Sequence, residues 1–86
     1  MVYPTINLGG TTGQSLMVDL FAAISAIDVA RAKLRDTAPH GRDYPNGDID
    51  QAIAEHHNRM KRLADVHSEL KLQTLNICGQ PDSRKR

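Results

Sequence analysis

The chain is divided by the stretch Asp36-Thr37-Ala38-Pro39-His40-Gly41-Arg42-Asp43-Tyr44-Pro45-Asn46-Gly47-Asp48, which contains two of its four prolines and two of its six glycines. Proline removes a backbone donor and glycine loses the most conformational freedom on folding, so both interrupt helices. Apolar residues recur at helical spacing on both sides of this stretch. The sequence therefore predicts two helices, over residues 11–37 and 48–78, joined by a loop over residues 38–47.

The first predicted helix carries two apolar stripes. Its start is indicated by Thr11 with Gln14, the spacing of a capping box, or alternatively by Thr12 with Ser15. One stripe consists of Leu16, Leu20, Ile24, Ile27, Ala30 and Leu34. The other consists of Met17, Phe21, Ala22, Ala26 and Val29. One partner helix cannot cover both stripes, so we expect further helices to pack against this one.

The second predicted helix has signals at both ends. Asp48 with Gln51 fits a capping box, and Gly79 followed by Pro81 is typical of a helix end. Its apolar stripe consists of Ile49, Ile53, His56, Met60, Leu63, Val66 or His67, Leu70 and Ile77.

These elements predict an all-α fold, an antiparallel two-helix hairpin in a single domain of residues 1–86. Residues 1–10 are expected to form a short extended arm, which lies across the helices or pairs with its copy in another subunit. Residues 79–86 are expected to form a flexible basic tail. A two-helix hairpin has almost no interior, so we expect a homo-oligomer packed as a helical bundle.

Composition narrows the classes of function. Eleven basic and ten acidic residues give a net charge of +1, which argues against a nucleic-acid partner. No stretch has the apolar length of a membrane span or the pattern of a signal peptide, so we expect a cytoplasmic protein without a membrane partner. Cys78 is the only cysteine, so an intramolecular disulfide is excluded, and we expect its side chain to be buried.

The usual catalytic and metal-binding patterns are absent from the sequence. His56 and His67 are eleven residues apart, or about 16 Å along a helix, too far to share one ion. No second cysteine and no His-x-x-x-His pair supplies the three or four ligands that zinc needs. We therefore expect no metal, no cofactor and no enzymatic activity. For His56 we expect a hydrogen-bonded position at the edge of the core.

The predicted loop concentrates side chains that can bind a ligand. Arg42 offers a planar fork for carboxylate or phosphate, and Tyr44 offers an aromatic face and a hydroxyl. Asp43 can accept hydrogen bonds from a base edge or orient Arg42, and His40 lies beside them. The alternative is structural: Arg42 and Asp43 cap helix ends while Tyr44 covers the tip of the bundle.

The glycines before the first helix suggest a second place for an anion. Gly9 and Gly10 lead into Thr11 and Thr12, where free amide groups of a helix start can bind phosphate or carboxylate. This segment lacks the lysine of a P-loop, so a plain helix cap flanked by permissive glycines is the alternative.

Three segments carry a resemblance to known proteins. They are Tyr3-Pro4-Thr5-Ile6-x-Leu8-x-Gly10-Thr11, Ala38-Pro39-x-Gly41-Arg42-Asp43-Tyr44 and Glu55-His56-x-x-Arg59. In these segments the chain resembles a group of small phage and prophage proteins of unassigned function. His40 and Pro45 stand where the resemblance leads us to expect Asn and Tyr. The resemblance implies a phage accessory protein that acts in the cytoplasm of a bacterial host.

Phage accessory proteins of this kind often counter host defence, and some resemble helical oligomers that sequester nucleotide immune signals. By this analogy we expect a non-catalytic protein that binds a cyclic nucleotide or an ADP-ribose-type signal. The candidate ligand-binding residues are Arg42, Tyr44, Asp43, His40, Thr11, Thr12, His56 and Arg59. The alternative is an inhibitor or modulator that binds a host protein through an exposed apolar helix face.

Overall fold

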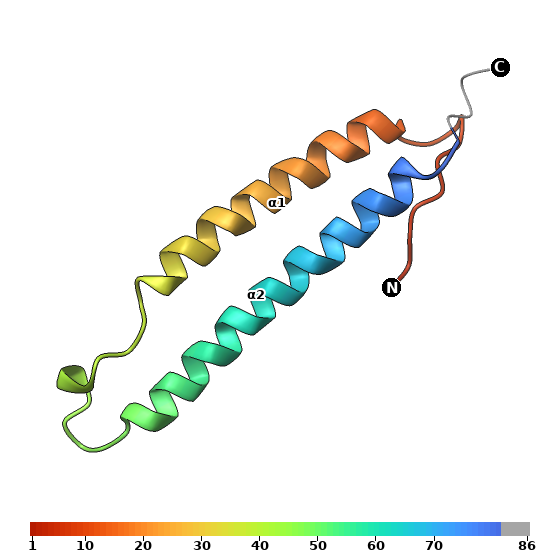
Figure 1. The fold of residues 1–86 in the computed structure, drawn as a ribbon. Coiled ribbons are helices and arrows are strands. Elements are labelled where there is room, and N and C mark those ends of the chain that lie inside the picture. Colours follow the sequence, from red (N-terminus) through yellow and green to blue (C-terminus); the bar gives the residue numbers. More distant parts are fainter. Residues whose placement is uncertain (82–86) are drawn as a thin grey trace.

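The computed structural model describes residues 1–81. Its elements are the helix α1 (Gly13–Arg35), the short 3-10 turn η1 (Gly41–Asp43) and the helix α2 (Ile49–Cys78). The two long helices run antiparallel and pack along their length (Figure 1). No strand occurs within residues 1–81. The predicted all-α hairpin is therefore confirmed.

The start of α1 is fixed by Thr12. Its side-chain oxygen accepts a hydrogen bond from the backbone amide of Ser15 at 3.0 Å, and its own backbone is extended. This satisfies one of the amide groups that a helix start leaves without a partner. The capping residue is therefore Thr12, and the pairing of Thr11 with Gln14 is wrong. At the other end α1 stops at Arg35, two residues before the predicted boundary.

The start of α2 lacks the predicted capping box. Asp48 occupies the capping position, but its side chain makes no capping hydrogen bond, and Gln51 instead lies 3.5 Å from the carboxylate of Glu55. Gly47 just before it has φ of +89°, in the left-handed region that favours glycine. Gly79, at the end of α2, has φ of −81° and needs no such freedom. Of these two glycines, only Gly47, just before α2, has a backbone conformation that requires glycine.

The hairpin encloses very little core. Within residues 1–81 the only buried apolar side chain is Ile77, and the buried polar ones are His56 and Thr74. The radius of gyration is 18.9 Å, whereas a compact chain of this length would have about 12 Å. The molecule measures 67 × 21 × 17 Å, the shape of a rod two helices wide.

The contact between the helices includes polar groups. Nε2 of His67 lies 2.8 Å from Oδ1 of Asp28 across the α1–α2 interface. The side chain of His67 is 12% exposed, whereas Val66 is 43% exposed. Of the two alternatives for the apolar stripe of α2, His67 is therefore the one that faces α1.

The two stripes of α1 have different environments. The first is half-buried against α2, apart from Ala30, which is exposed. In the second stripe Phe21 and Val29 are 54% and 61% exposed, and only Met17 is half-buried. The single partner helix leaves this second face uncovered, as the two-stripe pattern predicts.

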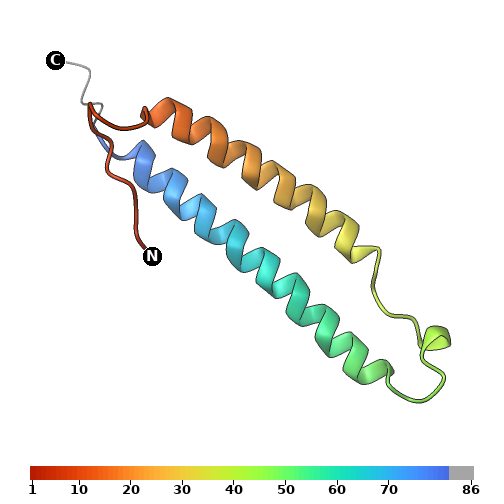
Figure 2. The ribbon, with the colours of Figure 1, turned by 180° about the vertical axis from the view of Figure 1, so that it is seen from behind.

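The segment before α1 is held against the end of α2. The amide of Ile6 donates to Oε1 of Gln80 at 2.8 Å, and Nε2 of Gln80 donates to the carbonyl of Pro4 at 2.7 Å. Both views of the ribbon show this segment beside the last turns of α2 (Figures 1 and 2). One glutamine side chain thus bridges residues that are more than seventy positions apart.

The C-terminal part corrects one prediction. Cys78 is exposed rather than buried, and the buried side chains in the last part of α2 are those of Thr74 and Ile77. The basic residues of the predicted tail, from Arg84 to Arg86, lie outside the described residues. No helix in the described part of the chain is both long and apolar enough to cross a membrane.

Candidate functional site

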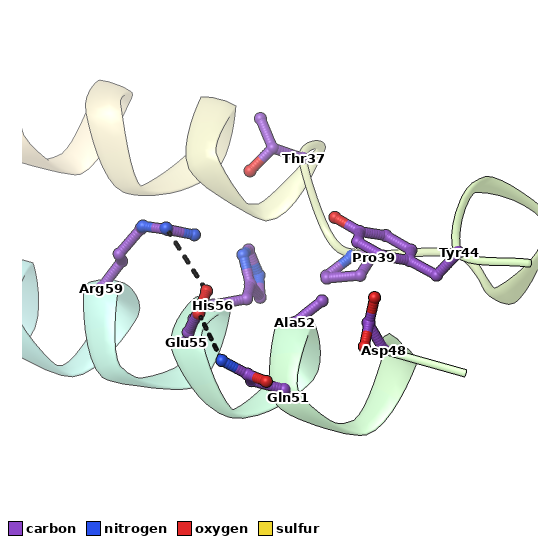
Figure 3. Close-up of a pocket in the computed structure, with 9 residues that line it drawn as sticks. All are labelled: Thr37, Pro39, Tyr44, Asp48, Gln51, Ala52, Glu55, His56 and Arg59. Atoms are coloured by element: carbon purple, nitrogen blue, oxygen red, sulfur yellow. Dashed lines mark hydrogen bonds and ion pairs between the residues drawn. The ribbon is translucent and has the colours of Figure 1, made fainter. Parts of the chain in front are cut away.

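A hollow of about 360 Å³ lies where the loop returns to α2. We call it the tip hollow (Figure 3). It is lined by Thr37, Pro39, Tyr44, Asp48, Gln51, Ala52, Glu55, His56 and Arg59. The residues thus come from the turn after α1, from the loop and from the start and first three turns of α2.

The face of α2 that lines the tip hollow follows from helical geometry. Residues three or four apart lie above one another on a helix, as do Asp48, Ala52, Glu55 and Arg59. Ala52 is small, and it lies between the larger side chains on this face (Figure 3).

His56 occupies the inner wall of the tip hollow. It is 6% exposed, and its ring lies between Arg59 and Pro39 (Figure 3). The neighbouring His57 is exposed, and the two rings are 6.4 Å apart with an interplanar angle of 48°. Of the two adjacent histidines, only His56 can therefore meet a ligand in the hollow.

The charged side chains of the tip hollow form a loose pair. Arg59 lies 4.0 Å from Glu55, and the side chains of the two residues are 54% and 51% exposed. Exposed pairs of this kind stabilise a protein by only about 0–1 kcal/mol, so a ligand can separate them at little cost. Together with Asp48 they give the hollow two carboxylates and one guanidinium.

Tyr44 is positioned by the hydrogen bonds of the loop backbone. Its amide donates to the carbonyl of Gly41 at 3.0 Å, and its carbonyl accepts from the amide of Gly47 at 3.3 Å. The ring is half-buried beside Pro39, and its hydroxyl end points toward Thr37 (Figure 3). The loop thus contributes an aromatic ring to the lining of the tip hollow.

The other predicted loop residues lie outside the tip hollow. His40, Arg42 and Asp43 are exposed on and beside η1, and none of them forms an ion pair with another residue of the described part. Arg42 and Asp43 do not occupy the cap positions of the long helices either, since those positions belong to Asp36 and Asp48.

The two predicted threonines lie at the other end of the molecule. Thr11 and Thr12 precede α1, whose 23 residues span about 35 Å before the loop begins. The side-chain oxygen of Thr12 is already used by its cap. Within one chain the structure therefore brings together Tyr44, His56 and Arg59, and it leaves Thr11 and Thr12 remote from them.

Several residues of the tip hollow escaped the sequence-based prediction, above all Thr37, Asp48, Gln51 and Glu55. A signal for three of them existed in the helical spacing. Steps of four, four and three positions back from Arg59 lead to Glu55, Gln51 and Asp48, which therefore share its side of α2. Thr37 had no such signal, because its hydroxyl also closes the last turn of α1 by donating to the carbonyl of Leu34 at 2.7 Å.

No group of three or more residues that could hold a metal ion occurs within residues 1–81. Comparison of the chain with protein-family models, with curated proteins and with solved structures found no match. The function therefore has to be argued from the tip hollow and from the exposed helix faces.

Proposed function

We propose that this protein is a non-catalytic binding protein that sequesters a small nucleotide-type signal, with the tip hollow as its ligand site. The observation that carries the proposal is that Tyr44, His56 and Arg59 line one hollow. Its volume of about 360 Å³ lies at the lower end of the range of ligand pockets, about 300–1,000 Å³.

The chemistry of the lining suits the parts of a nucleotide. The face of Tyr44 can stack with a base, because every base has a π-face. Asp48 and Glu55 can accept hydrogen bonds from ribose hydroxyls or from the amino groups of a base. Arg59 is the one cation of the hollow, and the exposed Arg42 is the nearest further guanidinium in the loop sequence. Since carboxylates repel phosphate, we assign the base and ribose to the hollow and the phosphates to its rim.

A role in countering bacterial defence rests on the resemblance to small phage proteins. Sequestration needs a rigid scaffold and a ligand site but no nucleophile or acid–base pair. In this proposal the protein acts as a homo-oligomer in the host cytoplasm, and residues 1–10 form an extended arm at the end of each hairpin.

Isothermal titration with cyclic dinucleotides, cyclic trinucleotides and cyclic ADP-ribose tests the proposal. We expect one ligand class to bind, and Tyr44→Ala to weaken that binding by about 5- to 150-fold, because stacking on an aromatic ring contributes about 1–3 kcal/mol per base. Arg59→Ala should weaken it as well. The exposed His57→Ala, one residue from the hollow, is the matched control and should bind normally.

The circular-dichroism spectrum and the molar mass of each variant should match those of the parent protein. If no compound of the panel binds the parent protein, the tip hollow is not a nucleotide site. If Tyr44→Ala unfolds the hairpin, the ring is structural and the site assignment fails.

A second candidate function is favoured by the uncovered face of α1, where Val18, Phe21 and Val29 are 54–61% exposed. A host protein could be inhibited by binding to this face. Light scattering distinguishes the two candidates, because a protein that is monomeric at micromolar concentration keeps the face free for a host protein.

A further inference from the structure

A second hollow, of about 290 Å³, adjoins the tip hollow. It is lined by Leu34, Arg59, Arg62 and Leu63, and we call it the arginine hollow. Arg59 lines both hollows, and its side chain extends from α2 toward α1 (Figure 3). Arg62 and Leu63 lie three and four positions after Arg59 and therefore share its side of α2. A ligand in the tip hollow can thus extend past Arg59 into the arginine hollow.

The arginine hollow differs from the tip hollow in its charge. It is lined by two leucines and two arginines, so no carboxylate of the described part of the chain lines it. The tip hollow is lined by Asp48 and Glu55 as well as by Arg59. Along α2 the charge thus changes from negative near Asp48 to positive near Arg62, fourteen residues or about 21 Å away. An anion is therefore attracted to the Arg62 end and repelled from the Asp48 end.

The guanidinium of Arg62 forms no ion pair with another residue of the described part. Asp65 lies within its reach by helical spacing, but the carboxylate of Asp65 lies 2.8 Å from Nζ of Lys61. Arg59 has only its loose contact with Glu55, at 4.0 Å. Like charges on adjacent turns of a helix repel each other, and an anion bound between Arg59 and Arg62 would offset that repulsion.

A third guanidinium lies about one turn from the arginine hollow. Arg31 is three positions before Leu34 on α1, and its Nε is buried without a hydrogen-bond partner in the described part. Asp28, its neighbour by helical spacing, lies 2.8 Å from Nε2 of His67 instead. No ion pair of residues 1–81 involves Arg31, so its charge adds to the positive potential at this level of the hairpin.

Phosphate is the anion that suits two arginines on one face of a helix. A guanidinium is a planar fork that can bind phosphate through two parallel N–H···O bonds. Arg59 and Arg62 can therefore bind two edges of one phosphate, or two neighbouring phosphates. Leu34 and Leu63 are half-buried and supply apolar surface beside the two forks. Attraction between opposite charges is stronger beside such surface than in bulk water.

We propose that the arginine hollow binds the phosphate groups of a nucleotide-type ligand, with Arg62 as a further binding residue and Arg59 shared between the two hollows. The inference deepens the proposed function and rests on it for the base and the ribose, which occupy the tip hollow. It also defines the ligand more narrowly. A nucleoside, which lacks phosphate, should bind much more weakly than a nucleotide with the same base.

Titration with pyrophosphate tests the phosphate site without a base. In NMR spectra the Nε–Hε signals of Arg59 and Arg62 should shift, because both guanidinium groups donate to the anion. Arg62→Gln keeps a polar side chain without the charge and should weaken binding by about 10-fold, near the lower limit for a hydrogen bond to a charged group. Lys71→Gln removes the same charge from an exposed position nine residues further along α2, and this matched control should bind like the parent protein.

Ionic strength provides a second measurement, which a merely structural role of Arg62 would not affect. Added sodium chloride screens charge pairs at the surface, so it should weaken pyrophosphate binding more in the parent protein than in Arg62→Gln. An equal salt effect in the two proteins, or pyrophosphate binding that is unchanged in Arg62→Gln, would overturn the inference. Shifts confined to Arg42 or to residues 84–86 would overturn it as well.

The nucleotide panel separates the inference from the proposed function. A compound that binds the parent protein and Arg62→Gln with equal affinity refutes this inference alone. Pyrophosphate that binds at Arg59 and Arg62, while no compound of the panel binds, supports the phosphate site and refutes only the proposed nucleotide function.

Discussion

Replacement of Gln80 by alanine should release the N-terminal segment while α1 and α2 stay folded. The side chain of Gln80 makes three hydrogen bonds, to the amide of Ile6 at 2.8 Å, to the carbonyl of Pro4 at 2.7 Å and to Oδ1 of Asn76 at 2.9 Å. The first two hold the segment, and the third fixes the glutamine on its own helix. Alanine removes all three without changing the backbone of α2.

The magnitude follows from the two bonds to the segment. Each such bond contributes about 0.5–1.5 kcal/mol net, so together they contribute about 1–3 kcal/mol. A loss of that size lowers the protection of the Ile6 amide against hydrogen exchange by about 5- to 150-fold. Amides in the middle of α2 should exchange as in the parent protein, because the substitution leaves the contacts between the helices in place.

Hydrogen exchange followed by NMR measures this effect at the Ile6 amide. Asn76→Ala is the matched control, since it removes one bond of Gln80 and leaves both bonds to the segment. Unchanged protection of Ile6 in Gln80→Ala would refute the reasoning and would mean that apolar contacts hold the segment. Faster exchange throughout α2 would show that Gln80 stabilises the whole hairpin.

Three further predictions concern one helix cap and two glycines. Thr12→Ala should lower the free energy of unfolding by about 1 kcal/mol, because the amide of Ser15 loses its hydrogen-bond acceptor. Thr11→Ala should leave the free energy of unfolding nearly unchanged. Urea titration measures both variants, and equal effects would contradict the assignment of Thr12 as the cap. Gly47→Ala should cost about 1–2 kcal/mol, because a side chain is strained at φ of +89° although no atom lies within 4 Å of the added carbon. Gly13→Ala should instead stabilise the protein by about 0.4–1 kcal/mol, since its added carbon makes only ordinary contacts of 3.8–3.9 Å. Thermal unfolding should therefore show a lower melting temperature for Gly47→Ala and a higher one for Gly13→Ala. A melting temperature that does not fall in Gly47→Ala would be evidence against the described turn.

The fold could be predicted because local signals agree with one another. Prolines 39 and 45 exclude a continuous helix, and the apolar spacing on both sides specifies two helices and the faces that meet. The exact ends of the helices were harder to predict, because several residue types can cap a helix. Thr11 and Thr12 are equivalent in the sequence, and only the geometry of the turn decides between them.

The candidate site was predictable in part. Tyr44 stands out as an aromatic residue in a loop, and His56 with Arg59 share one face of a helix by spacing alone. The distance between the loop and Thr12 also follows from the sequence, because the helix predicted over residues 11–37 separates them by about 35–40 Å within one chain. The exposure of Cys78 was missed, because its apolar neighbours in the sequence do not cover it in the last turn of α2.

The thin rod formed by α1 and α2 also determines how the protein behaves on a sizing column. A compact protein with a radius of gyration of 18.9 Å would have about 290 residues, more than three times the length of this chain. A single hairpin should therefore elute ahead of globular standards of its own mass and resemble an oligomer on a calibrated column. Only methods that report mass independently of shape, such as light scattering or sedimentation equilibrium, can count the chains in the assembly.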